Sequence, residues 1–310
     1  MSNKSTAYSC QGVTAIVAPC SARKEILSDA RLRAATLTRG SQRLVAKAWL
    51  SRLKSAPLAG TPARTLYAGR SFLRLRDSAE HLGCKLFVVS AGLGLLESTT
   101  LVPSYDLTLS AAGVGALRER LTHPPRPSDW WAGLEASPFA SSMGALCVGN
   151  SRILVALTQP YAELVGNALA MFADADRTRL RLLGFGLKPF LPVQLHPQLI
   201  RYDDRLDRLA PGTRLDGASR ALAHFAELVA MQPLDSVEVD QRLVDAALGA
   251  VPHAVRPTRK RVSDREIAKH VARFVKEGLS ATAALKQLRS MAKIACEERR
   301  FRDLYQEASR

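Results

Sequence analysis

The segment PCSARK (19–24) places several groups that could do chemistry directly after an apolar, strand-like run. Cys20 supplies a thiol, Ser21 a hydroxyl, and Arg23 and Lys24 two cations. Neighbouring cations and a helix start can lower the pKa of such a thiol. A lysine among other cations can act as an amine nucleophile or as a phosphate clamp. The alternative is an ordinary turn with exposed cations.

A second candidate segment is SAGLGLLESTTLVPSYDLTL (90–109). Gly92 would let the backbone approach a ligand closely. Tyr105 could stack on a base, and Asp106 could act as a general base or stabilise a developing cation. Alternatively, Asp106 caps a following helix.

A third segment, TQPY, contributes Gln159 and Tyr161. Glutamine can read a base edge with two hydrogen bonds, although a glutamine at a helix start is commonly only solvated. His196 and the pair Asp203-Asp204 either line the same rim or have no role.

The elements that must position these residues alternate between strands and helices, with hydrophobic runs bounded by Gly or Pro. This alternation predicts an α/β fold with a mainly parallel central sheet and helices on both faces. The candidate segments follow predicted strands, and ligands of such sheets bind beyond the carboxyl ends of the strands. We therefore expect one site built from several loops. The predicted strands are 12–19, 85–94, the start of 151–173, and 179–190; the predicted helices are 41–56, 67–83, 126–137 and the remainder of 151–173.

The sequence predicts an α/β catalytic domain over 1–250, a linker over 251–264, and a basic helical nucleic-acid-binding module over 265–310. Ser263 followed by Glu266 is typical of a capping box at a helix start. Three short helices with a Gly-containing turn suggest a helix-turn-helix module. The alternative is a helical hairpin packed on the main domain. The basic residues expected to contact nucleic acid on the last helix are Arg299, Arg300 and Arg302.

Clustered positive charge is the strongest compositional signal in the chain. The 310 residues include 44 Lys or Arg against 28 Asp or Glu, a net charge of +16. The excess lies in two segments: 256–310 has fifteen basic and seven acidic residues, and 20–80 has thirteen and four. Cations that displace counterions from phosphate favour a polyanionic partner. We therefore expect a nucleic acid, with DNA preferred over RNA.

Other classes of protein fit the sequence less well. Five widely spaced cysteines without a C-x-x-C pair argue against a structural zinc site, an iron–sulfur cluster or a disulfide framework. No apolar run reaches the roughly 18 residues of a membrane span, and the first residues lack a signal-peptide pattern. We expect a cytoplasmic protein with no cofactor, no metal and no membrane partner. The oligomeric state is left open.

Four motifs in order also carry a family resemblance. P-C-S-x-x-K, LYAGRSF, SAGLGLLE and PSYDLTL together resemble a bacterial family related to the YaaA-like proteins and to the carboxy-terminal catalytic region of archaeosine synthase. These relatives are similar in turn to the uracil-DNA-glycosylase-like α/β fold. The resemblance covers roughly 12–110 and, loosely, 150–190.

The resemblance implies chemistry on a nucleic-acid base. By motif position, it carries over Cys20, Ser21 and Lys24, and then Ser90, Gly92, Tyr105 and Asp106. The sequence departs from the motifs of these relatives at two places, and each departure argues against one of their activities. Glu25-Ile26 stands where archaeosine enzymes have Pro-Tyr, and the first loop has no water-activating Asp of the kind that uracil-excising enzymes use. In a glycosidic cleavage, Asp106 would therefore take that role or Lys24 would attack directly.

Three functions are consistent with these observations. The first is a DNA glycosylase that excises a modified base, a chemistry that some bacteria use against phages. The second is a base-modifying or transferase enzyme acting on RNA. The third is a non-enzymatic DNA-binding regulator whose N-terminal domain senses a nucleotide.

Overall fold

The computed structural model describes residues 13–56, 60–109, 115–253 and 258–309. Contacts divide the chain into two compact units, Met1–His253 and Ala254–Arg310. Each unit has its own cluster of buried apolar side chains.

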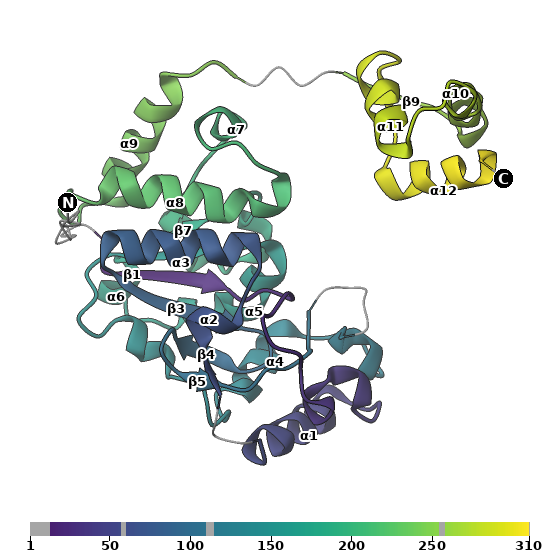
Figure 1. Cartoon of the computed structure of the whole chain (residues 1–310). Coiled ribbons are helices and arrows are strands. Elements are labelled where there is room, and N and C mark those ends of the chain that lie inside the picture. The colour runs from purple at the N-terminus through teal and green to yellow at the C-terminus, as the bar shows by residue number, and fades with distance from the viewer. Residues whose placement is uncertain (1–12, 57–59, 110–114, 254–257, 310) are drawn as a thin grey trace, which may run out of the picture. The chain divides into compact units, whose positions relative to one another are not determined.

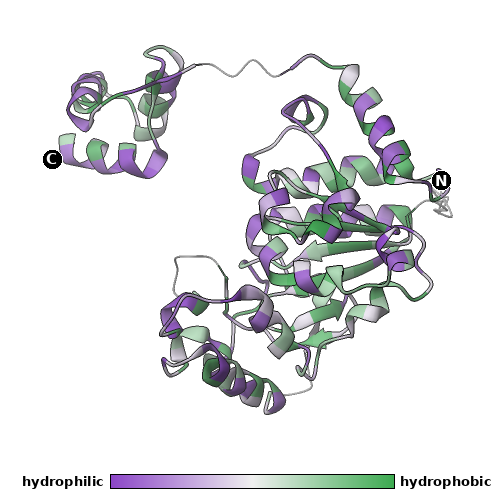
Figure 2. Cartoon of the chain, turned by 180° about the vertical axis from the view of Figure 1, so that it is seen from behind, coloured by the Kyte–Doolittle hydropathy of each residue, from purple (hydrophilic) through white to green (hydrophobic). Residues whose placement is uncertain are grey.

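The first unit is built on a six-stranded sheet with the order β4-β3-β1-β6-β7-β8. All neighbouring strands are parallel except β3 and β4. The inner strands are apolar because helices cover both faces of the sheet, and they appear mainly green in Figure 2. The predicted α/β class with a mainly parallel sheet is therefore confirmed. The strands are β1 (Ala15–Pro19), β3 (Lys85–Ser90), β4 (Gly94–Glu97), β6 (Ile153–Ala156), β7 (Leu180–Leu183) and β8 (Leu199–Ile200).

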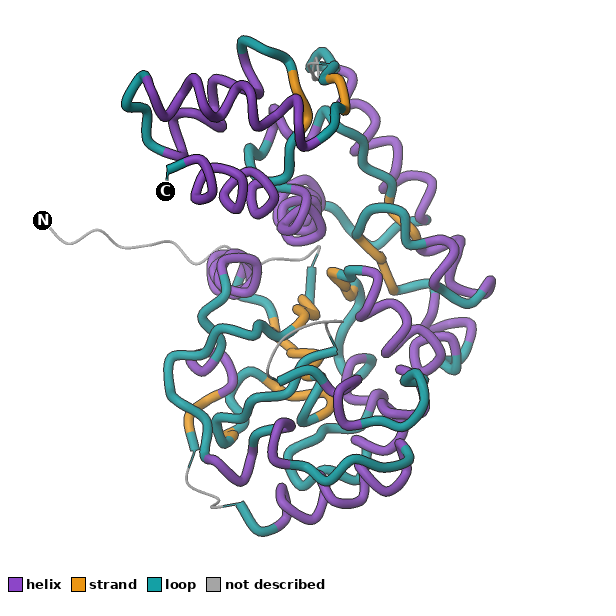
Figure 3. Tube along the Cα trace, turned by 90° about the vertical axis from the view of Figure 1, so that its right-hand side faces the viewer, coloured by secondary structure: helices purple, strands orange, loops and turns teal. Residues whose placement is uncertain are grey.

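Helices lie on both faces of this sheet (Figures 1 and 3). α3 (Arg70–Leu82) and α8 (Gly217–Val229) pack together on one face, and α5 (Gln159–Ala170) packs with α4 (Pro127–Leu134) on the other. Right-handed crossovers require this division, because β3 and β7 lie on opposite sides of the β1–β6 pair. α1 (Gln42–Lys54) packs against α4. The remaining elements of this unit are α2 (Ala63–Leu66), α6 (Asp174–Arg177), α7 (Leu206–Leu209), α9 (Val237–Gly249) and the pair β2 (Thr61–Pro62) with β5 (Leu101–Val102).

Two boundaries differ from the sequence-based prediction for reasons that concern the site. Helix α3 ends at Gly83 as expected, where a φ of 63° suits glycine. It begins at Arg70 rather than at Tyr67, because Tyr67 is extended and pairs with Lys24. The predicted strand 85–94 ends at Ser90, and the chain then turns back as antiparallel β4.

Over its described residues, 258–309, the second unit has three helices around a small core. α10 (Asp264–Lys276) is capped by the Ser263 hydroxyl, which accepts a hydrogen bond from the Glu266 N–H. A short turn at Gly278, with a φ of 71°, leads into the next helix. The other elements are α11 (Ala281–Ser290), α12 (Glu298–Ala308) and the parallel pair β9 (Lys260–Arg261) with β10 (Ile294–Ala295). Among the residues described in either unit, no helix is both long and apolar enough to cross a membrane.

Candidate functional site

The candidate site lies at the carboxyl end of β1, where three predicted segments meet. From β1 the chain proceeds to β3 on one side, and later to β6 on the other, so the strand order reverses between β1 and β6. Open α/β sheets bind ligands at such a reversal. Here, Cys20 follows β1, and Tyr161 lies in the first turn of α5, after β6.

A hydrogen-bonded cluster of hydroxyls and one thiol joins these loops. The Cys20 Sγ lies 3.1 Å from the Tyr161 hydroxyl, which also donates to the Cys20 carbonyl at 3.1 Å. The Tyr105 hydroxyl lies 2.7 Å from the Ser90 Oγ, 3.2 Å from the Tyr67 hydroxyl and 3.6 Å from the Cys20 Sγ. The cluster thus connects the ends of β1 and β3 with α5.

Burial sets the protonation of the tyrosines in this cluster. It raises the pKa of Tyr67, Tyr105 and Tyr161 above the ordinary value for a phenol, and the charge of a Cys20 thiolate would raise them further. These hydroxyls therefore remain neutral near pH 7 and act as hydrogen-bond donors and acceptors.

Lys24 lies over the aromatic rings of the cluster. Its Nζ is 4.2 Å from the centroid of the Tyr105 ring and 5.9 Å from that of Tyr67, within the range of a cation–π contact. Burial lowers the pKa of Lys24, whereas the charges of Cys20 and Asp106 act to raise it. The side chain is half-buried. A lysine in this setting can present either a cation or an amine.

Asp106 brings a carboxylate to the same neighbourhood. Its backbone is anchored in the loop after β1: its N–H donates to the Leu32 carbonyl at 2.8 Å, and its carbonyl accepts from Ala34 at 2.7 Å. The half-buried carboxylate has no hydrogen bond or ion pair within the described ranges. A Cβ added to Gly115 would lie 2.2 Å from the Asp106 Oδ1, so the glycine backbone packs directly against the carboxylate. Both side chains are half-buried, and the charge of Asp106 acts to raise the pKa of Lys24.

Three predicted ligand contacts differ from what the structure contains. Tyr105 is only 1% exposed and Ser90 is fully buried, so neither surface is open to a base or a sugar. Gly92 is buried too, and its missing Cβ makes room for the Tyr105 ring, which a Cβ would approach to 2.5 Å. The expectations that Tyr105 stacks on a base and that Gly92 admits a ligand are therefore corrected: these residues form a floor beneath Lys24.

Two tryptophans hold the loop of this floor from the side of α1 and α4. The Trp49 indole N–H donates to the Gly92 carbonyl at 2.6 Å, and that of Trp130 donates to the Ala91 carbonyl at 2.8 Å. Neither tryptophan was identified from the sequence, and neither was Tyr67. The signal for Tyr67 was its place in the LYAGRSF motif, read there only as part of a helix.

The other predicted residues near the site have local roles. The Ser21 Oγ donates to the Arg23 carbonyl at 2.6 Å and accepts from the Gly69 N–H at 3.0 Å, which ties the loop to the start of α3. Arg23 is exposed. Gln159 is exposed as well, and its amide donates to Glu163 at 3.1 Å, so it does not join the cluster.

The three basic residues of α12 that were predicted to contact nucleic acid differ in whether they already form an ion pair within the protein. Arg300 forms an ion pair with Asp264 at 2.6 Å, and Arg302 pairs with Glu298 at 2.8 Å. Arg299 is exposed and has no such partner among the described residues. The Arg300 pair could not be predicted because Asp264 is distant along the chain, whereas Glu298 and Arg302 are four residues apart on one helix, a spacing at which opposite charges meet.

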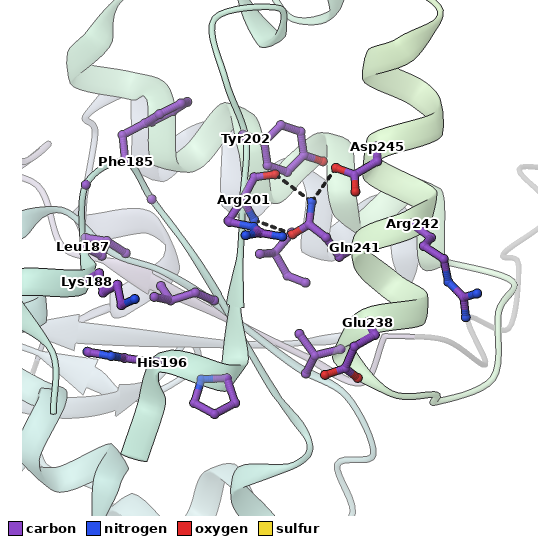
Figure 4. A pocket seen from close by; sticks show the side chains of 16 residues that line it. Phe185, Leu187, Lys188, His196, Arg201, Tyr202, Glu238, Gln241, Arg242 and Asp245 are labelled. Atoms are coloured by element: carbon purple, nitrogen blue, oxygen red, sulfur yellow. Dashed lines mark hydrogen bonds between the residues drawn. The ribbon is translucent and has the colours of Figure 1, made fainter. Parts of the chain in front are cut away.

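A cavity of about 540 Å³ lies elsewhere in this unit, at the carboxyl ends of β7 and β8 and beside α9 (Figure 4). His196 lines it, but its Nε2 lies 3.1 Å from the Leu191 carbonyl. Gln241 there accepts from the Arg201 N–H at 2.8 Å and donates to the Arg201 carbonyl at 3.1 Å. Neither of the predicted catalytic residues, Lys24 and Asp106, lines this cavity. We therefore place the candidate site at the Cys20–Lys24 cluster, where three of the predicted segments meet.

Asp203, Asp204 and His253 form a third group, whose possible ligand atoms lie within 4.8 Å of one another. Arg205 pairs with Asp203 at 2.7 Å, and His253 lies 2.9 Å from Asp204. Their side chains are thus engaged with each other and with Arg205, away from the Lys24 cluster.

One part of the first unit matches the model of a known family. The model of a family of unknown function (DUF6884) matches residues 51–120. That range contains Tyr67, Ser90, Tyr105 and Asp106, and leaves out Cys20 and Lys24. No curated protein and no solved structure matches the chain. Over 51–120, the chain is therefore similar to a family of unknown function, in the part that supplies the floor and the carboxylate of the site.

Proposed function

We propose that this protein is a DNA glycosylase that excises a modified base by hydrolysis of the N-glycosidic bond. The observation that carries the proposal is the place of Lys24 at the carboxyl end of β1, over a floor of neutral tyrosines and near enough to Asp106 for that carboxylate to raise the lysine's pKa. The clustered positive charge supports a polyanionic substrate. The uracil-DNA-glycosylase-like fold, the helix-turn-helix character of the second unit and a role in phage defence are parts of the same proposal.

The two charged groups divide the reaction between them. As the bond from C1′ to the base breaks, its electron pair leaves with the base and positive charge develops on the sugar. The Asp106 carboxylate stabilises that charge and accepts a proton from the water that attacks C1′. The Lys24 ammonium holds a neighbouring phosphate. The base takes up a proton as it leaves.

The test is an assay of abasic sites in duplexes that carry uracil, hydroxymethylated or glucosylated pyrimidines, with unmodified DNA alongside. Asp106→Asn should retain the fold and DNA affinity but lose about 10²- to 10⁴-fold in rate, the usual range for removal of a general base. Asp129→Asn is the matched control, because Asp129 is an exposed carboxylate on α4. Full activity in Asp106→Asn would exclude this carboxylate from the reaction.

The lowered pKa of Lys24 favours one variant of this mechanism, in which the amine attacks C1′. Borohydride would then trap a covalent protein–DNA adduct that Lys24→Ala abolishes. Absence of an adduct, with activity retained in Lys24→Arg, assigns Lys24 to phosphate binding. Chemistry on RNA alone, or DNA binding without any product, would replace the proposal by the transferase or the regulator.

A further inference from the structure

A basic hollow of about 620 Å³ lies beside the candidate site, over the outer face of α3 and the loop after β1. Three arginines line it: Arg23 from the loop, and Arg70 and Arg74 from the first two turns of α3. Arg23 and Arg70 are exposed, and Arg74 is half-buried. Of these three arginines, only Arg23 belongs to a segment that the sequence marked as a candidate site.

These three guanidinium groups lack acidic partners among the residues that the structure describes. The Nε of Arg74 is buried and has no hydrogen-bond partner. Two acids also line the hollow, but Asp77 already pairs with Arg76 at 2.7 Å, which leaves Glu227. The hollow therefore carries a net positive charge, with three arginines against one acid that has no ion pair among the described residues.

The backbone links this hollow to the site. Residues 23–25 run antiparallel to 66–68: the Ala68 N–H donates to the Arg23 carbonyl at 3.0 Å, and the Glu25 N–H donates to the Leu66 carbonyl at 3.0 Å. Successive side chains of an extended segment point to opposite sides. Lys24 therefore points over the Tyr105 ring while Arg23 points into the hollow.

We propose that Arg23, Arg70 and Arg74 bind successive phosphates of the DNA strand whose base enters the site at Lys24. This inference rests on the proposed function. Guanidinium groups bind phosphate oxygens through paired hydrogen bonds. Three of them spread over a surface hollow suit an extended phosphodiester backbone, whereas a single phosphate would need convergent donors.

The test compares DNA binding by two triple variants of the full chain. Arg23→Gln/Arg70→Gln/Arg74→Gln removes the hollow's charge. The matched control, Arg31→Gln/Arg126→Gln/Arg205→Gln, removes three arginines of the same unit that pair with Asp29, Asp129 and Asp203, none of which lines the hollow. Fluorescence anisotropy with a labelled duplex between about 50 and 200 mM salt measures affinity and its salt dependence. Circular dichroism confirms that both variants are folded.

The slope of log K against log salt is negative, and each lost phosphate contact should reduce its magnitude by about 0.9. The magnitude of the slope should therefore fall by about two to three in the hollow variant and by less than about one in the control. Equal losses in the two variants would mean that only net charge matters, and an unchanged slope in the hollow variant would mean that DNA does not contact it. Either result overturns the inference.

A competition arm separates the DNA backbone from a free phosphate as the ligand. At constant ionic strength, millimolar inorganic phosphate or deoxynucleoside monophosphate should not displace the duplex. Displacement that requires the three arginines would assign the hollow to a free phosphate and overturn the inference. Because binding is measured without turnover, failure here with abasic sites still produced would leave the proposed function intact. A slope of reduced magnitude in the hollow variant, without any abasic product from the wild type, would support the phosphate contacts and contradict the glycosylase proposal.

Discussion

The Lys24 ammonium lies over the Tyr105 ring in a half-buried position, and burial lowers its pKa from the ordinary 10.5. The folded protein therefore holds a cation that its surroundings disfavour. Lys24→Met removes the charge and keeps much of the volume, so we expect the variant to be more stable by about 0.5–2 kcal/mol, as at other sites where function opposes stability. It should lose DNA affinity or activity at the same time. Urea unfolding at pH 7, with the DNA assays above, measures both.

The pH dependence of stability supplies a check on this prediction. Between the lowered pKa of Lys24 in the folded state and its ordinary value, the unfolded chain binds more protons at this residue, so stability rises with pH. Lys24→Met should lack that increment, and its advantage over the wild type should shrink as the pH approaches 10. A loss of stability at pH 7 would mean that the favourable contacts of the Lys24 ammonium, with the Tyr105 ring and the Asp106 charge, outweigh the effect of burial.

In the loop between β3 and β4, Gly92 leaves the space that the buried Tyr105 ring occupies. An alanine Cβ at Gly92 would lie 2.5 Å from the buried Tyr105 ring, which has no room to move away. Gly92→Ala should therefore destabilise the protein by about 1–3 kcal/mol, the usual range for overpacking. Gly133→Ala is the control: its Cβ would lie 3.7 Å from that of Ala46, an ordinary contact, and it should be neutral or stabilising by up to about 1 kcal/mol. Equal midpoints of denaturant unfolding would contradict the role given to Gly92.

Several elements could be predicted from the sequence because their signals are local. The apolar runs of β1, β3 and β6 and the Gly83 stop of α3 gave the sheet and its helices. That in turn placed Cys20, Lys24 and Tyr161 at one end of the sheet. The antiparallel β4 was missed, since it continues the apolar run of β3 beyond a turn with Gly94 at a φ of 91°.

Burial of polar side chains could not be predicted, because it depends on partners far along the chain. The sequence predicts Tyr105 as a ligand contact. In the structure its hydroxyl lies within hydrogen-bond distance of Ser90 and Tyr67, and its ring packs against Gly92. Arginine in a strand likewise suggests an exposed face. Yet Arg152 of the β6 region and Arg181 of β7 are fully buried and share Asp240 of α9 at 3.1 and 2.5 Å.

At the scale of the whole molecule, the positive charge is divided between two separately packed units. The buried apolar cluster of the first unit ends at Leu248, and that of the second begins at Ile267, so neither core needs side chains of the other. Residues 256–310 hold fifteen basic and seven acidic residues, and those of 20–80 include the three arginines of the hollow. We infer that each unit contributes separately to the affinity for DNA.

Truncation to residues 1–253 tests this division. Because the first core is complete without the second, the truncated chain should show the same melting transition that the first unit gives in the full chain. DNA affinity should fall, and the salt slope should decrease by about 0.9 for each phosphate that the second unit contacts. Arg299→Gln in the full chain is the local probe, with an expected decrease near one, whereas Arg302→Gln should change less because Arg302 already pairs with Glu298. A truncated chain that melts normally and keeps the full salt slope would assign the basic helices a role other than DNA binding.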